Sequence, residues 1–183
     1  MSRRLDKRRA IIPAVVFATL VLGYGAYRLG GSAGDVPAHP SSDPHFVNAA
    51  SLERDDATLH QAFQASVALL QTGEYEYAVK GFHDVLRIAP EMPEAHANMG
   101  FALLGLGKYV EARDFFNAAA GLRPSQINAY YGLAIAHEGL GELREAVTVM
   151  RAYTHLAVEG DPFRRKAEAA IWEWEAALAA TKQ

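Results

Sequence analysis

The chain has 183 residues, half of them hydrophobic, with 18 Lys and Arg against 21 Asp and Glu and no cysteine. The lack of cysteine excludes disulfides, zinc–thiolate sites and a thiol nucleophile. Residues 1–28 are basic, with six Lys and Arg against one acid, whereas residues 45–183 are acidic, with twelve against eighteen. Because phosphate contacts need a basic face, this balance predicts no nucleic-acid partner.

The N-terminal segment predicts a single transmembrane helix. Residues 1–9 form a basic tail, and residues 10–28 carry no charge until Arg28. Eighteen uncharged residues would span about 27 Å as a helix, close to the ~30 Å of a bilayer core. Because basic flanks stay on the cytoplasmic side, we expect a cytoplasmic N-terminus and an extracytoplasmic remainder. In a bacterium this is an inner-membrane protein whose main domain is periplasmic.

A cleaved signal peptide is the alternative interpretation of this segment. Gly31, Ser32 and Ala33 are small residues near a possible cleavage point. The apolar run is longer than the ~7–15 residues of most signal peptides, which favours a retained anchor. Mature protein that begins near residue 34 would refute retention.

Small residues recur along one side of the predicted membrane helix. Small side chains four residues apart let two membrane helices approach closely, so the stripe predicts pairing with a second helix, although such residues are common in membrane spans. The stripe consists of Ala10, Ala14, Ala18, Ala26 and Gly30. After it, residues 29–50 are rich in Gly, Ser, Ala and Pro and predict a flexible linker.

From about residue 51 the sequence repeats every 34 residues. Fixed-period self-similarity indicates stacked units rather than one globular core, and it favours recognition over catalysis. The repeated positions are Gly73, Gly107 and Gly141; Ala78, Ala112 and Ala146; and Phe82, Phe116 and Met150. The predicted units are 59–92, 93–126 and 127–160, within a domain of residues 51–160. The predicted helices are 58–71, 74–88, 93–105, 109–121, 126–139 and 143–158.

These residues resemble the tetratricopeptide repeat (TPR) family, in its membrane-anchored bacterial type. The unit 93–126 carries Gly100, Leu103, Tyr109, Ala112, Phe116, Ala119 and Pro124 at the family's positions. The resemblance implies an all-α fold: a solenoid of about three helical hairpins, here with an N-terminal transmembrane helix and a C-terminal capping helix.

Several positions depart from the pattern. The first unit has Ala62 and Ser66 where a bulky residue and a glycine are usual. In the third unit His137 replaces a leucine, and we expect a partly buried packing histidine. Val158 stands where proline is usual, so we expect the last repeat helix to continue to Gly160.

Residues 161–183 predict a capping helix and a short tail. Asp161 can cap the helix and Pro162 suits its first position. The capping helix is expected over 163–180. We expect Trp174 to pack on the third unit and Trp172 to lie nearer the solvent.

The TPR resemblance also implies a concave groove lined by the first helix of each unit. The predicted apolar wall of this groove is Phe63, Val67, Leu70, Ala97, Phe101, Leu104, Tyr131 and Ile135. The predicted rim is His60, Glu94, Asn128 and Glu138. An exposed apolar strip is typical of an interaction site, here for an extended peptide or an amphipathic helix. Cover by the chain itself, for instance by residues 45–57, is the structural alternative.

Two expectations concern what this groove binds. Some TPR proteins clamp the terminal carboxylate of a chaperone tail with lysine and asparagine, but Phe63 and Val67 occupy the corresponding first-unit positions. We therefore expect no such clamp. We also expect Phe101→Glu to weaken partner capture without unfolding the domain.

No sequence motif indicates an enzyme, a metal site or a cofactor. The chain has no glycine-rich phosphate loop, no HExxH motif and no recognisable nucleophile context. We therefore predict a membrane-anchored adaptor for assembly of a membrane or periplasmic complex, similar to anchored TPR proteins of cytochrome c maturation. A permanent accessory subunit of a membrane enzyme and a homo-oligomer built through the groove remain alternatives.

Overall fold

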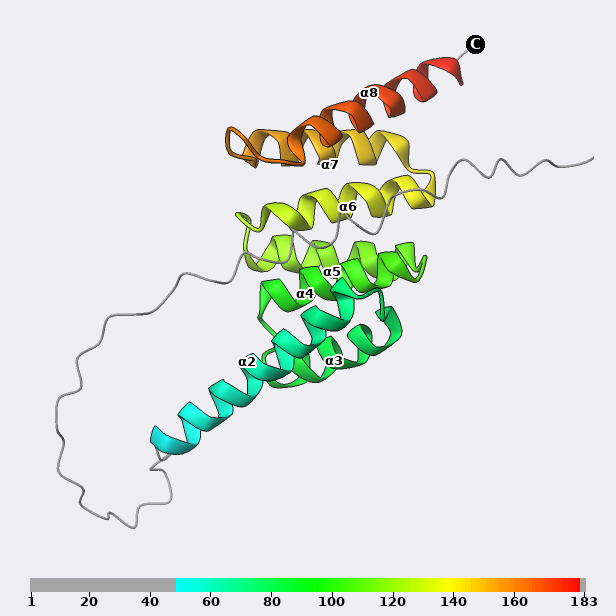
Figure 1. The fold of residues 1–183 in the computed structure, drawn as a ribbon. Coiled ribbons are helices and arrows are strands. Elements are labelled where there is room, and N and C mark those ends of the chain that lie inside the picture. The colour runs from blue at the N-terminus through cyan, green and yellow to red at the C-terminus, as the bar shows by residue number, and fades with distance from the viewer. Residues whose placement is uncertain (1–48, 182–183) are drawn as a thin grey trace, which may run out of the picture.

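The computed structural model describes residues 49–181, with side chains from residue 56 onward. This part of the chain is all-α, with seven helices and no strand. The helices are α2 (Ala49–Gln71), α3 (Tyr75–Ile88), α4 (Pro93–Gly105), α5 (Tyr109–Leu122), α6 (Ile127–Leu140), α7 (Leu143–Leu156) and α8 (Arg164–Ala180). They stack in chain order from α2 and α3 at one end to α8 at the other (Figure 1).

The predicted membrane helix at 10–28 and nearly all of the predicted linker lie outside the described residues. Among the helices from Ala49 to Ala180, none combines the length and the apolar character that crossing a bilayer requires.

The 34-residue register appears directly in the helix bounds. The second helices of the three units, α3, α5 and α7, each have 14 residues. The turns before them place Gly73, Gly107 and Gly141 at φ of 82°, 71° and 80°. Glycine takes this left-handed conformation at little cost, so the same tight turn closes each hairpin.

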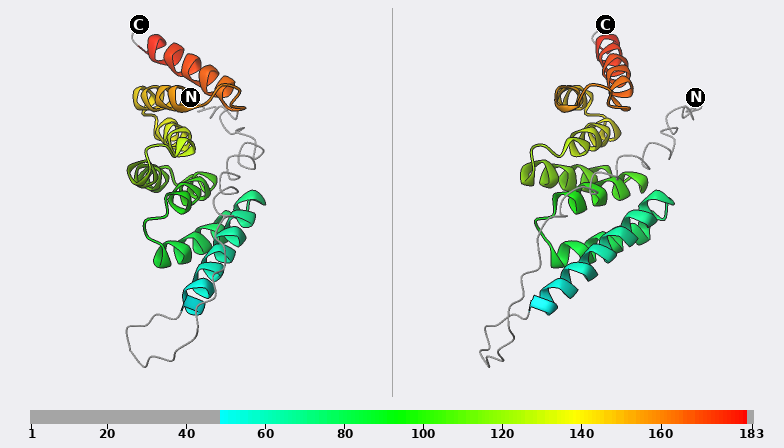
Figure 2. Two further views of the ribbon diagram at one scale, coloured as in Figure 1. Left: turned by 90° about the vertical axis from the view of Figure 1, so that its left-hand side faces the viewer. Right: turned by 60° about the vertical axis from the view of Figure 1, so that its left-hand side comes forward.

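The side chain of Phe116, in the second helix of the second unit, lies between the first helices of two neighbouring units. A Cβ built on Gly100 would lie 2.8 Å from the Phe116 ring, and one built on Gly132 would lie 2.2 Å from it. The ring is fully buried. Phe116 of α5 therefore contacts the backbones of both α4 and α6, which joins the second unit to the third. Figure 2 shows the arrangement that results, with α2, α4 and α6 along one side of the stack and α3, α5 and α7 along the other.

In the first unit the two helices also approach closely, but the glycine lies in the second helix instead of the first. Ser66 stands in α2 where α4 has Gly100, and its hydroxyl donates to the Ala62 carbonyl at 2.8 Å. Across the hairpin, a Cβ on Gly81 would lie 2.2 Å from Ser66 Oγ. The small residue has moved to α3, so the two helices still approach closely.

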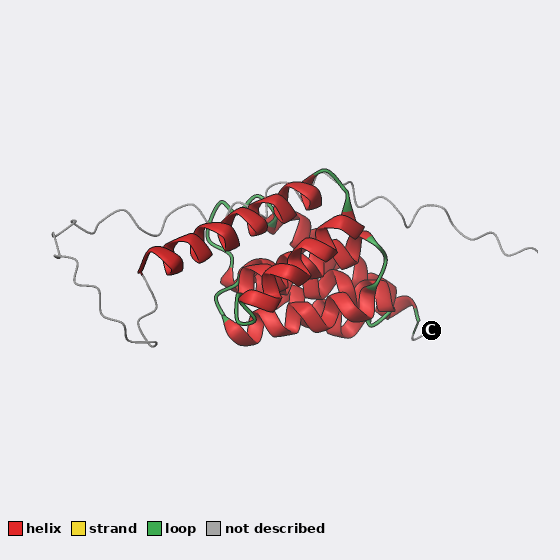
Figure 3. Cartoon of the chain, turned by 90° about the horizontal axis from the view of Figure 1, so that it is seen from below, coloured by secondary structure: helices red, strands yellow, loops and turns green. Residues whose placement is uncertain are grey.

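Two helix ends differ from the sequence-based expectations. Helix α2 begins at Ala49, well before Thr58, and extends past its neighbours (Figures 1 and 3). Helix α7 ends at Leu156, so the expected continuation to Gly160 is wrong. Ala157 leaves the helix at φ −67° and ψ 131°. Valine at position 158 is compatible with a helix but does not require one, and the chain leaves α7 before it to turn toward α8.

Candidate functional site

The predicted apolar wall is mostly inside the protein. Phe101 is 2% exposed and Tyr131 is 8% exposed, and only Leu104 and Ile135 of the eight residues are partly exposed. The other buried members are Phe63, Val67, Leu70 and Ala97. The expectation of an exposed wall is therefore wrong for six of its eight residues. Whether a partner contacts Leu104 and Ile135 stays a prediction.

The wall is buried because its aromatic rings point back into the hairpins. The Phe101 ring meets Phe116 edge-on with centroids 4.9 Å apart, and Phe63 meets Phe82 in the same way at 5.9 Å. These side chains occupy the space between the two helices of a unit. The proposed Phe101→Glu variant would place a carboxylate in this core, so it would test stability rather than binding.

At the third unit, the cover comes from the turn before α8. The Tyr131 ring lies edge-on to Tyr153, at 5.2 Å, and to Phe163, at 5.9 Å. Asp161 Oδ1 accepts hydrogen bonds from the Tyr153 hydroxyl at 2.7 Å and from the Phe163 backbone N–H at 2.8 Å. The carboxylate of Asp161 thus organises the turn before α8. The expectation that Asp161 caps the helix with Pro162 at its first position is wrong, because the N-cap residue is Phe163 and α8 begins at Arg164. Burial, followed by the bond to Asp161, raises the pKa of Tyr153.

One of the four predicted rim residues, Glu138, holds the capping helix. Trp174 is 4% exposed, and its indole Nε1–H donates to Glu138 Oε1 at 2.9 Å. Burial, with Glu138 as a second cause, raises the pKa of Tyr131. The expectation that Trp174 packs on the third unit is confirmed. The role of Glu138 was missed because its partner lies 36 residues further along the chain.

Two other rim residues, Glu94 and Asn128, are linked by a polar chain that runs from one unit to the next. Glu94 forms an ion pair with Arg123, which follows α5. Arg123 also lies 3.4 Å from Gln126 Oε1, and Gln126 Nε2 donates to Asn128 Oδ1 at 2.9 Å. The chain orders the N-terminal ends of α4 and α6 relative to each other.

An open hollow lies at the remaining rim residue, His60. It has a volume of about 340 Å³ and is lined by Asp56, Leu59, His60 and Phe63 from α2 and by Met92. The four α2 residues follow the spacing i, i+3, i+4 and i+7, which places them on one helix face. Met92 comes from the turn between α3 and α4. The hollow therefore has an apolar floor with a carboxylate and an imidazole at its edge.

A second hollow, of about 370 Å³, shares Met92 with the first. Its other lining residues are Ala89, Pro90, Glu91, Pro93, Glu94 and Arg123. Because Met92 lines both, the two hollows adjoin along the edge where the units meet. Both hollows lie beside predicted rim residues, and Phe63 is the predicted wall residue that lines one of them.

The first helices of the three units carry no lysine or arginine in the part whose side chains the structure describes. Residues 56–71 of α2, all of α4 and all of α6 lack lysine and arginine. The same stretches hold three acids, Asp56, Glu94 and Glu138. Arg123 neutralises Glu94 from outside these helices, so the local charge stays negative.

The described residues hold no group of three or more side chains placed to bind a metal ion. His137 is partly buried, as expected, and its Nδ1 lies 2.6 Å from Glu142 Oε2. This pair joins the end of α6 to the start of α7. Its position at a hairpin turn, away from both hollows, indicates a structural role.

Comparisons with known proteins agree with this architecture. The family model of the tetratricopeptide repeat matches residues 93–126, which is the second unit. A search of curated protein sequences finds no match.

Solved TPR structures have the same fold. The first TPR domain of Spaghetti (RPAP3), bound to the HSP90 peptide SRMEEVD, is 23% identical, with a TM-score of 0.61 over 66% of this chain and 93% of that one. The type III secretion chaperone SycD of Yersinia enterocolitica, with a peptide of the translocator YopD, is 19% identical, with a TM-score of 0.61 over 66% and 94%. The TPR2B domain of yeast Sti1, in a complex with pHsp70, is 21% identical, with a TM-score of 0.61 over 64% and 96%. The described part of the chain therefore has the fold of a TPR solenoid.

Proposed function

We propose that this TPR solenoid is a membrane-tethered adaptor that binds a peptide segment of a partner protein at the hollow beside His60. The observation that carries the proposal is the open, apolar-floored hollow of about 340 Å³ between α2 and Met92. TPR domains of the same fold bind peptides of their partner proteins, which supports a peptide ligand here. Nothing in the described residues favours catalysis over binding.

The charges around the hollow favour a neutral or basic peptide. An apolar side chain of the peptide enters the space between Leu59, Phe63 and Met92, and a neighbouring lysine or arginine meets Asp56. The HSP90 peptide SRMEEVD on Spaghetti is acidic near its end. Residues 56–71 of α2, all of α4 and all of α6 lack lysine and arginine. An acidic peptide is therefore disfavoured here, because burying a carboxylate without a cationic partner costs free energy.

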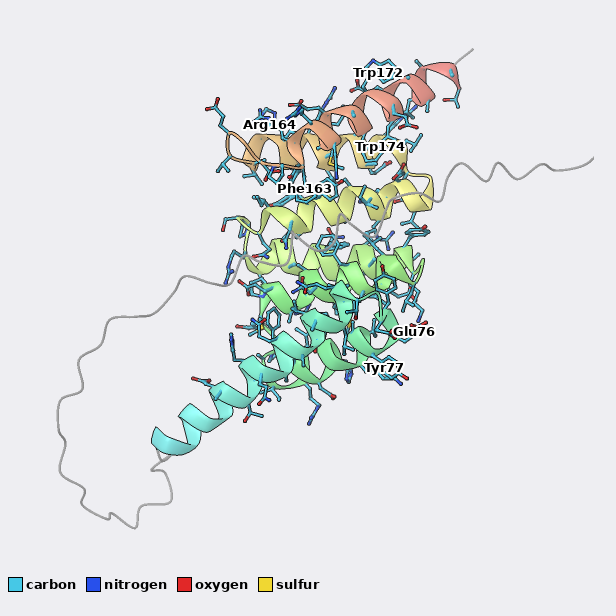
Figure 4. The ribbon with its side chains drawn as sticks, viewed as in Figure 1. Glu76, Tyr77, Phe163, Arg164, Trp172 and Trp174 are labelled. Carbon is cyan, nitrogen blue, oxygen red and sulfur yellow. The ribbon has the colours of Figure 1, made fainter. Side chains whose placement is uncertain are left out.

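A peptide panel tests the site directly. We expect peptides with an aromatic or leucine anchor beside lysine to bind more tightly than the same peptides with glutamate in place of lysine, as measured by fluorescence anisotropy. Asp56→Lys should reverse this preference, because Asp56 is exposed and lies at the edge of the hollow. Glu76→Lys, on the exposed side of α3 (Figure 4), is the matched control and should leave the preference unchanged. Equal binding of both peptide classes by the parent protein would reject the proposal.

The tether rests on the sequence. The uncharged stretch after the basic tail, followed by the linker at 29–50, would hold the solenoid within reach of partners at the membrane surface. Tethering of this kind raises the effective concentration of a weak site, to the millimolar range for short flexible linkers. Resistance of the protein to alkaline extraction, together with an N-terminus that precedes residue 10, would support the anchor. Mature protein beginning near residue 34 would refute it.

The small-residue stripe of Ala10, Ala14 and Ala18 favours a second candidate, a permanent accessory subunit packed against another membrane helix. Cross-linking in native membranes, followed by mild solubilisation and mass spectrometry, separates the two. A single partner at fixed stoichiometry would identify a subunit and reject the transient adaptor. Substoichiometric and varied partners would identify an adaptor.

A further inference from the structure

One face of helix α8 packs against the solenoid, and the opposite face is exposed to solvent. At about 100° per residue, Ala167 and Trp174 lie on the side that packs against the solenoid, and both are buried. Arg165, Ala169 and Trp172 lie on the opposite side. Figure 4 shows Trp172 pointing away from the stack and Trp174 lying between α8 and the helices beneath it.

This outer face combines one large aromatic side chain with small neighbours. Trp172 is 74% exposed, the most exposed of the large hydrophobic side chains in the described residues. Ala169, Ala176 and Ala179 are exposed on the same face. A tryptophan is costly to leave in water and is enriched at the centres of interfaces. The alanines beside it leave room for the backbone of another helix.

Two charges on this face are left without an ion pair within the described part of the chain. Arg164 pairs with Glu168 at 3.3 Å, and Glu175 pairs with Arg151 at 2.5 Å. Arg165 and Glu173 are exposed and have no such partner among residues 56–181. Arg165 comes four residues before Ala169, and Glu173 comes four residues after it. The face is therefore self-complementary about Ala169.

We propose that the outer face of α8 binds the same face of a second copy, with the two helices antiparallel and crossing at Ala169. In this register Arg165 of each copy meets the partner's Glu173, so one two-fold axis forms two ion pairs. Trp172 packs against the partner's helix beside the crossing, and the small side chain of Ala169 allows close approach there. A parallel pair would place like charges opposite each other.

The charge balance of α8 favours a second copy over a lipid surface, and the small contact area sets the strength of the dimer. The charges of α8 balance, with Arg164, Arg165 and Lys166 against Glu168, Glu173 and Glu175, so an anionic membrane gains little from it. One helix pair also falls below the ~1,200 Å² of a standard stable interface, so the dimer is weak in free solution. Membrane tethering, where present, would concentrate it. This inference uses a different end of the molecule from the peptide hollow and does not depend on it.

The absence of native cysteine permits a direct test by disulfide cross-linking. Ala169→Cys places two thiols at the two-fold axis of the proposed dimer. Ala177→Cys, exposed on α8 but off the face, is the matched control. In the full-length protein in mild detergent, we expect oxidation to cross-link the first variant at least about tenfold faster than the second. Equal rates would overturn the proposal.

A charge exchange tests the register. In the Ala169→Cys background, Arg165→Glu or Glu173→Arg alone should slow cross-linking at least about fivefold, because each places like charges opposite each other. The double variant should restore the parental rate, since the two ion pairs re-form with exchanged signs. Failure of the double variant to recover, with an unchanged circular dichroism melting curve, would reject this dimer. Vesicle binding that depends on Trp172, without cross-linking at residue 169, would assign the face to a lipid surface and would also reject it.

Discussion

Phe101→Ala distinguishes a structural role of the groove helices from a ligand-binding one. The side chain is 2% exposed and packs edge-on against Phe116, which itself contacts Gly100 and Gly132. Truncation leaves a cavity at the centre of the second unit, beside the Phe116 ring that joins this unit to the third. Phe→Ala changes in such cores cost about 3–5 kcal/mol, against a total stability of about 5–15 kcal/mol for a domain.

Urea denaturation followed by circular dichroism measures this loss. We expect a lower midpoint with an unchanged slope, and a melting temperature lower by about 10–15 °C. Trp172→Ala, on the exposed face of α8, is the control and should change the free energy of unfolding by no more than about 0.5 kcal/mol. A loss below about 1 kcal/mol for Phe101→Ala, combined with loss of peptide binding, would show that this side chain belongs to a surface and would refute the reasoning.

Three further predictions follow from the packing. Gly132→Ala should lower the free energy of unfolding by about 1–3 kcal/mol, because the new Cβ would lie 2.2 Å from the buried Phe116 ring. Gly121→Ala, with open space around it, should raise the free energy of unfolding by about 0.5–1 kcal/mol, and equal effects of the two variants in chemical denaturation would contradict this packing. The pKa of Tyr153 is raised in the folded protein, so its phenol stabilises the fold fully below the ordinary pKa of 10.0 and less as pH rises above that value, because the phenol of the unfolded chain ionises first. The free energies of unfolding at pH 8 and pH 11 should therefore differ by about 1 kcal/mol less in Tyr153→Phe than in the parent, and the same difference in both proteins would refute this. Glu138→Leu should leave the Trp174 indole N–H without an acceptor and increase amide hydrogen exchange throughout α8, with little change in α4; uniform protection in both would show that this bond does not hold the helix.

Local signals were enough to locate most helices. Helix α4 has the expected bounds, Pro93–Gly105, because Pro93 suits a first helical position and apolar residues recur at helical spacing between the two turns. The recurring glycines mark the hairpin turns, since few other residues adopt a positive φ at low cost. The end of α7 lacked such a signal, and there the expected bound was wrong.

The candidate site was predictable only in part. His60, Glu94 and Asn128 follow the repeat register, with Glu94 and Asn128 at the start of α4 and α6 and His60 at the corresponding position within the longer α2. The two hollows adjoin His60 and Glu94. The burial of the wall did not follow from helical periodicity, because one helix shows which residues share a face but not what lies opposite. That Phe116 would be covered by glycines on two helices, and Phe101 by Phe116, depends on how neighbouring units stack.

The sequence by itself determined the repeat and the hairpins, because these depend on residue types at fixed local spacing. Only the tertiary structure decided which apolar side chains are exposed. It placed Phe101 in the core, assigned Glu138 to the indole of Trp174, and left Trp172 in solvent on the far side of the same helix. The reason is physical: exposure depends on contacts between segments far apart in the chain, and each of those contacts forms only when the units have stacked.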